Sequence, residues 1–221
     1  MTFVDTVDQR GGAMIAGFEA CYLYAYPDPG TGGEPWTIGI GATKFDGQGG
    51  VKRGDRITFD RAVARFKETI DRKYTPQVVH ALGMLPQHKL NAGVSFHYNT
   101  GAIVSGTIDD KLRIGSEAAA LRTWAAYVKA GGRVMKGLET RRAEELRLWR
   151  TGAYTRRLIL VRDAQGGKRY IAPENFPWRV TAPSPAITMD RPVLPPMPQK
   201  RPRENFLLDL INYIRESLGW I

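Results

Sequence analysis

The chain has 221 residues and a mass of 24.7 kDa, enough for one domain with a buried core and a smaller appendage. Its net charge of +10 favours anionic partners, of which nucleic acid, membrane headgroups and cell-wall polymer are the usual classes. A single cysteine, Cys21, excludes an internal disulfide, so no oxidising compartment is required. The first twenty residues lack the basic start of a signal peptide and any membrane-spanning apolar run. Synthesis in the cytosol is therefore allowed.

The N-terminal part predicts a helix followed by a β-hairpin. Ile15, Phe18 and Tyr22 fall on one helical stripe, and Glu19 lies at its rim, one turn after Ile15. From Tyr22 the period changes, because "YLYAYPD" and "WTIGIGATKF" are rich in aromatic and β-branched residues. The turn-rich "PGTGGEP" between them predicts a hairpin with Asp28 at its tip.

After Gly54 the pattern becomes helical. Behind a Thr58 cap, apolar residues recur at helical spacing at Phe59, Val63, Phe66, Ile70 and Tyr74. Pro86 can open the next helix, "PQHKLNAGVSFHYNTG", and Gly101 can end it. Two more helices are predicted over "SEAAALRTWAAYV" and "LETRRAEELRLWRTG". Residues 1–155 are therefore expected to form an α+β domain, with a small β-hairpin lobe and a larger helical lobe.

Residues 156–203 differ in composition from the part before them. The stretch "TRRLILVRDAQGGKRYIAP" predicts a short hairpin around residues 164–167. Nine of the fourteen prolines then fall between Pro173 and Pro202, which indicates a semi-stiff linker. Residues 204–221 predict an amphipathic helix with one apolar stripe, made of Leu207, Ile211, Ile214, Leu218 and Ile221. We expect this helix to find a partner: its own chain, another protein or an anionic membrane.

Two carboxylates in unlike surroundings suit the hydrolysis of a glycosidic bond, which needs one protonated acid and one ionised carboxylate. Glu19 lies beside Phe18 and Tyr22, and apolar neighbours favour its neutral form. Asp28, in a wet turn, is expected to stay ionised, and the Thr37 hydroxyl on the returning strand can hold a water against it. On these residues alone, a solvated glutamate and an ordinary turn aspartate remain the better interpretation.

Three blocks in fixed order change that balance, because together they resemble the phage-type lysozymes, glycoside hydrolase family 24. The first block holds Glu19, Asp28 nine residues later, and Thr37 in "WTIGIGAT". The others are "SFHYNTGAIVSGTIDDKLRIG" and "WAAYVKAGGRVMKGLETRRAEELRLW", and the resemblance covers about residues 13–154. It implies a lysozyme-like α+β muramidase that cuts between N-acetylmuramic acid and N-acetylglucosamine with inversion. Glu19 would be the acid, and Asp28 and Thr37 would handle the water.

The sequence also departs from this family. Ala20 and Ala42 stand where relatives usually have glycine and histidine, and the Asp28 to Thr37 spacing is longer than usual. The extra residues bring Glu34 near the hairpin tip, where it is a rival of Asp28. Arg142 matches an arginine that in relatives lies near the catalytic glutamate, where a cation favours the ionised form. A solvated helix charge is the alternative interpretation of this arginine.

No cofactor or metal is expected. The three histidines are too few and too irregularly spaced for a zinc site, and each is expected on a helix surface or in packing: His80, His88 and His97. Trp124 and Trp149 are expected in the core rather than as sugar platforms. Cys21 lacks a nearby histidine that would make it a nucleophile.

Three functions remain open on the sequence. The first is a phage endolysin or virion-associated lysozyme that degrades peptidoglycan in the periplasm or from a virion, with no nucleic-acid partner. The second is an inactive lysozyme-like module that binds the wall or a protein. The third gives the main activity to a membrane-active terminal helix. If that helix only targets the enzyme, a chain ending at Ala172 is expected to cleave soluble peptidoglycan normally and to act more weakly on intact envelopes. The oligomeric state is left open.

Overall fold

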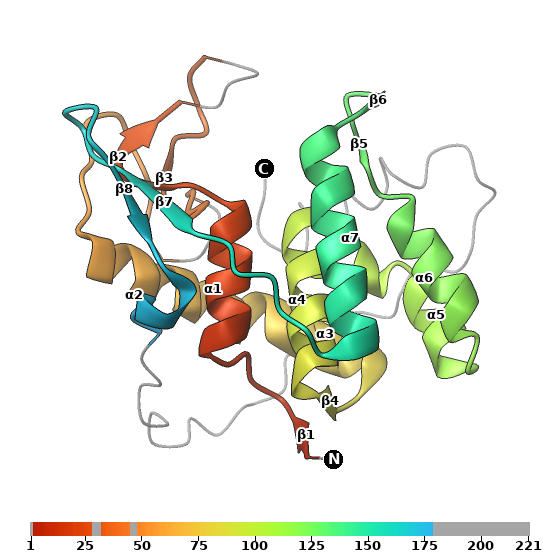
Figure 1. Ribbon diagram of the computed structural model, residues 1–221. Coiled ribbons are helices and arrows are strands. Elements are labelled where there is room, and N and C mark those ends of the chain that lie inside the picture. The colour runs from red at the N-terminus through yellow and green to blue at the C-terminus, as the bar shows by residue number, and fades with distance from the viewer. Residues whose placement is uncertain (1, 28–31, 45–47, 179–221) are drawn as a thin grey trace. The chain divides into compact units, whose positions relative to one another are not determined.

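The computed structural model describes residues 2–27, 32–44 and 48–178, which form the predicted α+β fold (Figure 1). The α-helices are α1 Gln9–Phe18, α2 Phe59–Thr69, α3 Thr75–Leu82, α4 Gln87–Thr100, α5 Ile108–Arg113, α6 Glu117–Ala125 and α7 Lys136–Thr151. The strands are β1 Phe3–Val4, β2 Cys21–Tyr26, β3 Thr37–Gly39, β4 Leu85–Pro86, β5 Lys129–Ala130, β6 Arg133–Val134, β7 Ile159–Arg162 and β8 Lys168–Ile171. The predicted terminal helix at residues 204–221 lies outside the described residues.

Four of the strands form one sheet in the order β3-β2-β7-β8. β2 pairs with β3 in antiparallel orientation and with β7 in parallel orientation, and β7 and β8 form an antiparallel hairpin. Figure 1 shows α1 between this sheet and helices α4 and α7. The end of α1, where Glu19 lies, is therefore the point at which the helical part meets the sheet.

Two adjacent glycines let α1 pack closely on its neighbours. The helix begins after Asp8, whose carboxylate accepts a hydrogen bond from the Gly11 N–H at 2.9 Å. A Cβ atom on Gly11 would lie 2.3 Å from the Asn91 side chain, and one on Gly12 would lie 2.5 Å from the ring of Trp178. Side chains at these two positions would push away a residue of α4 and a residue near the end of the described chain.

Several helix signals in the sequence are confirmed. The Thr58 hydroxyl caps α2 by accepting a hydrogen bond from the Arg61 N–H at 3.3 Å. The helix then continues through a π-helical segment, Ile70–Tyr74, directly into α3. α4 begins after Pro86 and ends at Gly101, which adopts a φ of +67°. No helix in residues 2–27, 32–44 and 48–178 combines the length and apolarity needed to cross a membrane.

The core lies mainly among the helices, and both predicted core tryptophans are in it. Trp124 is fully buried and Trp149 is 2% exposed, with ring centroids 5.4 Å apart. His97 is also buried, as the packing interpretation predicted, with its Nε2 atom 2.5 Å from Gln77 Oε1. These residues therefore stabilise the fold rather than lining a surface.

Burial of His97 predicts a pH-dependent stability. Burial is the main cause that lowers the pKa of this imidazole from 6.5 to about 4. As the pH falls, His97 is therefore protonated in the unfolded chain before it is protonated in the folded one. The free energy of unfolding is highest above pH 6.5 and decreases by about 3 kcal/mol as the pH falls to about 4. We expect a His97→Gln variant to show a flatter profile over this range in urea unfolding. If the unfolding free energy of the variant and of the wild type changed equally with pH, His97 would not be the group responsible.

The segment after α7 is part of the compact unit, which extends to Arg179. The hairpin expected around residues 164–167 forms as β7 and β8, and Phe176 and Trp178 beyond it are 1% and 5% exposed. The Trp178 indole N–H donates to the Val7 carbonyl at 3.2 Å. A cut after Ala172 would remove these two core side chains, so that truncation would damage the enzyme unit itself. A test of the terminal helix requires a chain that ends after Arg179.

Loss of the Trp178 side chain is expected to destabilise the protein strongly. Its ring contacts Gly12 of α1 and lies 5.6 Å from the ring of Phe66 in α2, so truncation leaves a large cavity. We expect Trp178→Ala to lower the free energy of unfolding by about 3–5 kcal/mol in urea titrations. The control is Phe3→Ala, which removes a ring that is 55% exposed. Similar losses in the two variants would contradict a core role for Trp178.

Candidate active site

Glu19 lies at the junction between α1 and β2. Its backbone N–H donates to the Ala16 carbonyl at 3.2 Å, which closes the last turn of the helix. Its own φ and ψ, −100° and 152°, are already extended, and strand β2 begins two residues later. The side chain is 29% exposed, so a substrate can reach the carboxylate.

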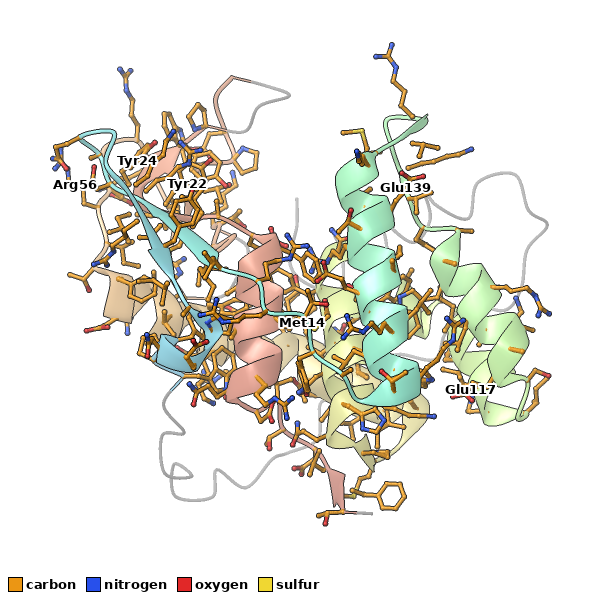
Figure 2. The ribbon with its side chains drawn as sticks, in the orientation of Figure 1. Met14, Tyr22, Tyr24, Arg56, Glu117 and Glu139 are labelled. Carbon is orange, nitrogen blue, oxygen red and sulfur yellow. The ribbon has the colours of Figure 1, made fainter. Side chains whose placement is uncertain are left out.

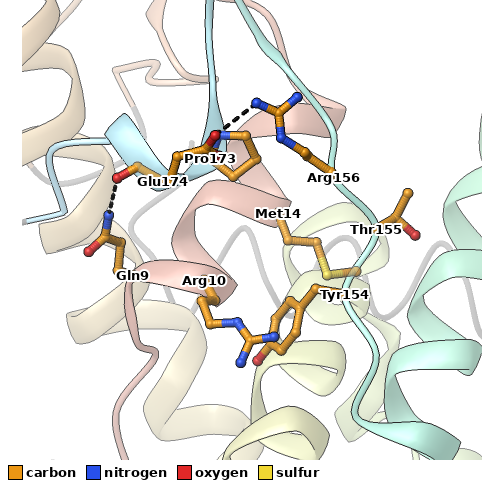
Figure 3. Close-up of a pocket in the computed structure, with 8 residues that line it drawn as sticks. All are labelled: Gln9, Arg10, Met14, Tyr154, Thr155, Arg156, Pro173 and Glu174. Carbon is orange, nitrogen blue, oxygen red and sulfur yellow. Dashed lines mark hydrogen bonds and ion pairs between the residues drawn. The ribbon is translucent and has the colours of Figure 1, made fainter.

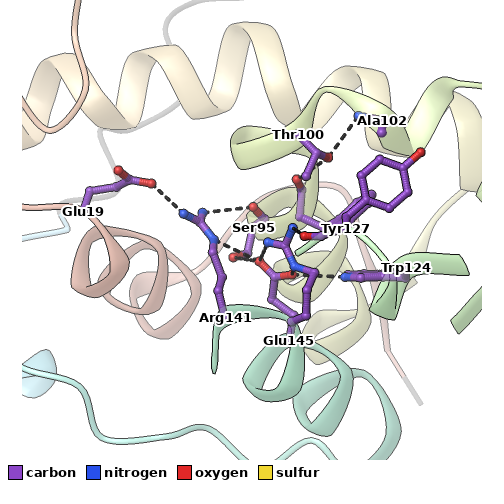
Figure 4. A network of polar contacts seen from close by, with 10 residues as sticks. Glu19, Ser95, Thr100, Ala102, Trp124, Tyr127, Arg141 and Glu145 are labelled. Atoms are coloured by element: carbon purple, nitrogen blue, oxygen red, sulfur yellow. Dashed lines mark hydrogen bonds and ion pairs between the residues drawn. The ribbon is translucent and has the colours of Figure 1, made fainter. Parts of the chain in front are cut away.

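The carboxylate of Glu19 is held by an arginine from α7 (Figure 4). Arg141 Nη1 donates to Glu19 Oε1 at 2.6 Å, and the arginine side chain is only 5% exposed. The other two nitrogens of Arg141 also donate, Nε to Glu145 Oε1 at 3.1 Å and Nη2 to the Ser95 carbonyl at 3.1 Å. Because every arm of the guanidinium has a partner, its position relative to Glu19 is fixed.

A fully buried glutamate anchors this arrangement. Glu145 accepts hydrogen bonds from the Ser95 hydroxyl at 2.7 Å and from the Trp124 indole at 3.0 Å. Arg142 approaches the same carboxylate with Nη2 2.9 Å from Oε1 and Nε 2.7 Å from Oε2. One buried anion is therefore shared by two buried cations, Arg141 and Arg142.

The arginine beside Glu19 is thus Arg141. The resemblance to the phage-type lysozymes indicates Arg142 for this place, and that prediction is wrong. Arg142 is 2% exposed, so it is not a solvated helix charge either. Burial lowers the pKa of its guanidinium, and the charge of Glu145 opposes that shift. The sequence does not distinguish the two arginines, because Arg141 and Arg142 lie four and three residues before Glu145 and both are within reach of it.

Thr37 begins β3, directly opposite Tyr26 of β2. Residues opposite each other in a strand pair project from the same face of the sheet, so Thr37 and Tyr26 share a face. Asp28, the second predicted carboxylate, lies outside the described residues. Its rival Glu34 is exposed and forms an ion pair with Lys44 at 3.3 Å.

The "TIGIGA" stretch after Thr37 forms a tight loop that requires its glycines. Ile38 and Ala42 exchange two backbone hydrogen bonds, of 2.8 and 3.0 Å, across the loop. Gly39 and Gly41 adopt φ values of +62° and +71°, which other residues rarely adopt. Space is a second constraint at Gly41, where a Cβ atom would lie 2.5 Å from the Tyr98 hydroxyl.

Tyr98 from α4 connects this loop to Glu19. Its hydroxyl donates to the Ile40 carbonyl at 2.9 Å and so fixes the loop. Burial is the main cause that raises the pKa of Tyr98 well above its usual value, and the charge of Glu19 adds to the shift. Tyr98 therefore stays a neutral hydrogen-bond donor near the candidate acid.

Cys21 is not suited to nucleophilic chemistry. The side chain is fully buried, and burial raises the pKa of its thiol to about 12, against a smaller opposing effect of Arg169. The thiolate is therefore scarce at neutral pH, and Cys21 acts as the small packing residue that the sequence predicted.

A pocket of about 470 Å³ lies at the other end of α1 (Figure 3). It is lined by Gln9, Arg10, Met14, Tyr154, Thr155, Arg156, Pro173 and Glu174. The charged side chains that line it have partners within the pocket. Arg156 donates to Glu174 at 2.8 Å, and the Arg10 guanidinium carbon lies 3.9 Å from the centroid of the Tyr154 ring. These contacts attach the C-terminal segment to α1, and none of them involves Glu19 or Thr37.

Comparison with known proteins gives a consistent picture. A 33% identical relative, the endolysin of Lactococcus phage c2, aligns over 144 residues, or 65% of this chain and 59% of the relative. The chain therefore spans about three fifths of the length of this curated relative. Among solved structures, the endolysin from Escherichia coli O157:H7 phage FAHEc1 is 26% identical, with a TM-score of 0.58 over 68% of this chain and 96% of the other.

A mutant of P22 lysozyme is 25% identical, with a TM-score of 0.55 over 66% of this chain and 99% of that one. The described fold is therefore lysozyme-like. The phage lysozyme family model matches residues 16–145, a range that contains Glu19, Thr37 and the whole Arg141 to Glu145 network. The resemblance seen in the sequence is confirmed, and the chain belongs to the phage lysozyme family.

Proposed function

We propose that the protein is a muramidase that hydrolyses the β-1,4 bond between N-acetylmuramic acid and N-acetylglucosamine in peptidoglycan. The observation that carries the proposal is the geometry of Glu19, a partly exposed carboxyl group fixed by Arg141 at 2.6 Å within the family-matched region. A carboxyl group held rigidly at a helix end can deliver its proton to a glycosidic oxygen placed against it. The expected site of action is the bacterial cell wall.

Arg141 has a defined part in this chemistry. When Glu19 gives up its proton it becomes negative, and the guanidinium 2.6 Å away stabilises that developing charge. Glu145, 3.1 Å from Arg141 Nε, fixes the guanidinium in this position. The buried glutamate therefore helps Arg141 to orient Glu19.

Asp28 and Thr37 are proposed to handle the water. In an inverting enzyme a second carboxylate activates a water on the opposite face of the sugar, and a hydroxyl can orient that water. The nine-residue spacing from Glu19 supports Asp28, and the ion pair between Glu34 and Lys44 gives Glu34 a separate structural role.

An inactive module that only binds the wall is the alternative. It rests on three departures from the family pattern: Ala20, Ala42 and the longer hairpin between Asp28 and Thr37. Ala42 is 7% exposed and packs with Ile38 and Val51 in a small apolar cluster, so it contributes to loop packing rather than to the reacting groups. Intact placement of Glu19 and its arginine supports the active enzyme over the binding module.

The anomeric configuration of the product tests the proposed mechanism. With Asp28 and Thr37 activating water, the first-formed hemiacetal is expected to be the α-anomer, inverted from the β-linkage. Proton NMR of the product from a soluble peptidoglycan fragment, recorded before mutarotation, distinguishes the two anomers. A fresh β-anomer would contradict the roles given to Asp28 and Thr37, while leaving Glu19 as the acid.

A further inference from the structure

The outward face of the four-stranded sheet carries a cluster of aromatic side chains. Tyr22, Tyr24 and Tyr26 occupy alternate positions of β2, and the strand is irregular there, because its register with β3 shifts between Tyr22 and Tyr26. The Tyr22 ring centroid lies 5.8 Å from that of Tyr24 and 4.3 Å from that of Tyr26. The opposite side of the sheet faces the core, where Cys21 is fully buried and Val161 is 2% exposed.

Cations from neighbouring segments flank this tyrosine cluster. Tyr22 pairs with Arg162 of β7, whose guanidinium lies 5.7 Å from the Tyr22 ring centroid, and Arg162 in turn pairs with Lys168 of β8. Arg56 pairs with Tyr24 across an isolated bridge, and Figure 2 shows Tyr22, Tyr24 and Arg56 close together at this end of the sheet. Paired residues share a face, so three tyrosines and three cations form one surface.

We call this surface the basic tyrosine face, made of Tyr22, Tyr24, Tyr26, Arg56, Arg162 and Lys168. Within residues 2–27, 32–44 and 48–178, no carboxylate forms an ion pair with any of its three cations. The nearest acids in sequence serve local turns. Asp163 accepts hydrogen bonds from two backbone N–H groups of the β7–β8 turn, and Asp55 accepts one from Lys52 N–H at 2.9 Å.

The basic tyrosine face is continuous with the candidate active site. Tyr26 pairs with Thr37 across β2 and β3, so the tyrosine cluster reaches the residue proposed to hold the catalytic water. A polymer that occupies the site can therefore reach the tyrosine cluster of β2.

The cationic part of this face comes partly from outside the matched family region. The family model matches residues 16–145, whereas Arg162 and Lys168 belong to the hairpin β7–β8 beyond that range. Parallel pairing of β7 with β2 brings these two cations next to the tyrosines. On the same face of this hairpin, Tyr170 of β8, opposite Leu160, adds a ring that is 61% exposed.

We propose that the basic tyrosine face binds the peptidoglycan strand beyond the bond being cut, an inference that rests on the proposed function. Tyrosine rings present flat apolar surfaces on which the C–H faces of sugar rings can pack. Arginine and lysine recognise the carboxylates of the peptide stems. An anionic membrane would also attract the cations, but the continuity of this face with Thr37 favours a glycan.

The test measures binding without turnover, in a Glu19→Gln background, to purified insoluble sacculi. The variant Arg162→Gln/Lys168→Gln removes two cations of the face, and we expect binding to weaken about fivefold to tenfold. The matched control is Arg122→Gln/Arg147→Gln, which removes two exposed cations from α6 and α7 and is expected to bind like its parent. A second probe is sacculi whose carboxylates are blocked as neutral amides.

On blocked sacculi we expect the parent to bind as weakly as the Arg162→Gln/Lys168→Gln variant, and that variant to show no further loss. Equal weakening in the control variant would overturn the proposal, because the effect would then reflect net charge alone. Weakened binding to phosphatidylglycerol vesicles with unchanged binding to sacculi would overturn it in favour of a membrane. Wild-type hydrolysis by the Glu19→Gln parent would sink the proposed function instead, and the binding comparison would still be valid.

Discussion

Replacement of Glu19 by glutamine is expected to reduce peptidoglycan hydrolysis by about 10²–10⁴, because it removes the transferable proton at almost constant shape. The fold should be retained. Arg141 keeps its contacts with Glu145 and the Ser95 carbonyl, and Glu19 is only partly buried. Release of soluble muropeptides from purified peptidoglycan measures the activity, and a circular dichroism melting curve checks the fold.

The control for this experiment is Glu34→Gln, which removes an exposed carboxylate whose partner is Lys44. We expect this variant to stay close to wild type in the same assay. If Glu34→Gln lost activity as severely as Glu19→Gln, the second carboxylate of the mechanism would be Glu34 rather than Asp28. Wild-type turnover in Glu19→Gln would remove Glu19 from the mechanism altogether.

The second large effect is expected on stability, from Glu145→Gln. The wild-type carboxylate is fully buried and balances two arginine side chains that are 5% and 2% exposed. A neutral amide leaves the buried Arg142 without the anion that balances it, while Arg141 keeps its ion pair with Glu19, and we expect a loss of about 3–5 kcal/mol of unfolding free energy. Urea unfolding monitored by tryptophan fluorescence measures the loss.

Glu139→Gln is the matched control, since Glu139 lies on the same helix but is exposed near its first turn. Its favourable interaction with the helix dipole is worth about 0.3–1 kcal/mol, so a small loss is expected. A loss in Glu145→Gln no larger than this would show that the buried network contributes little to folding. Activity gives a second readout, because the Arg141 that orients Glu19 depends on Glu145 for its own position.

Local signals allowed much of the fold to be predicted. A capping threonine at Thr58, a terminating glycine at Gly101 and the change of period after Tyr22 each act within a few residues, so sequence alone shows them. The three ordered sequence blocks, the first of which holds Glu19 and Thr37, indicated the phage lysozyme family. Hydrophobic periodicity alone could not have identified it. The placement of Glu19 at a helix end beside a strand follows from the same local signals.

The long-range partners could not be predicted in this way. Parallel pairing of β7 with β2 joins residues about 140 positions apart, and nothing in the hairpin sequence specifies that neighbour. Trp178 follows two prolines in a stretch whose composition predicts a linker. Its place in the core is seen only in the structure, where its ring packs against Gly12 of α1. The choice between Arg141 and Arg142 depended on which side of α7 faces Glu19, which requires the packing of α7 against α4.

The chemical identity of the new reducing end tests the central claim most directly. Peptidoglycan is digested with the intact protein, the products are reduced with borohydride, and the reduced sugar is identified after acid hydrolysis. A muramidase leaves N-acetylmuramic acid at the reducing end, so muramitol is expected from wild type and not from Glu19→Gln. Glucosaminitol, or newly freed amino groups without any new reducing sugar, would contradict the account.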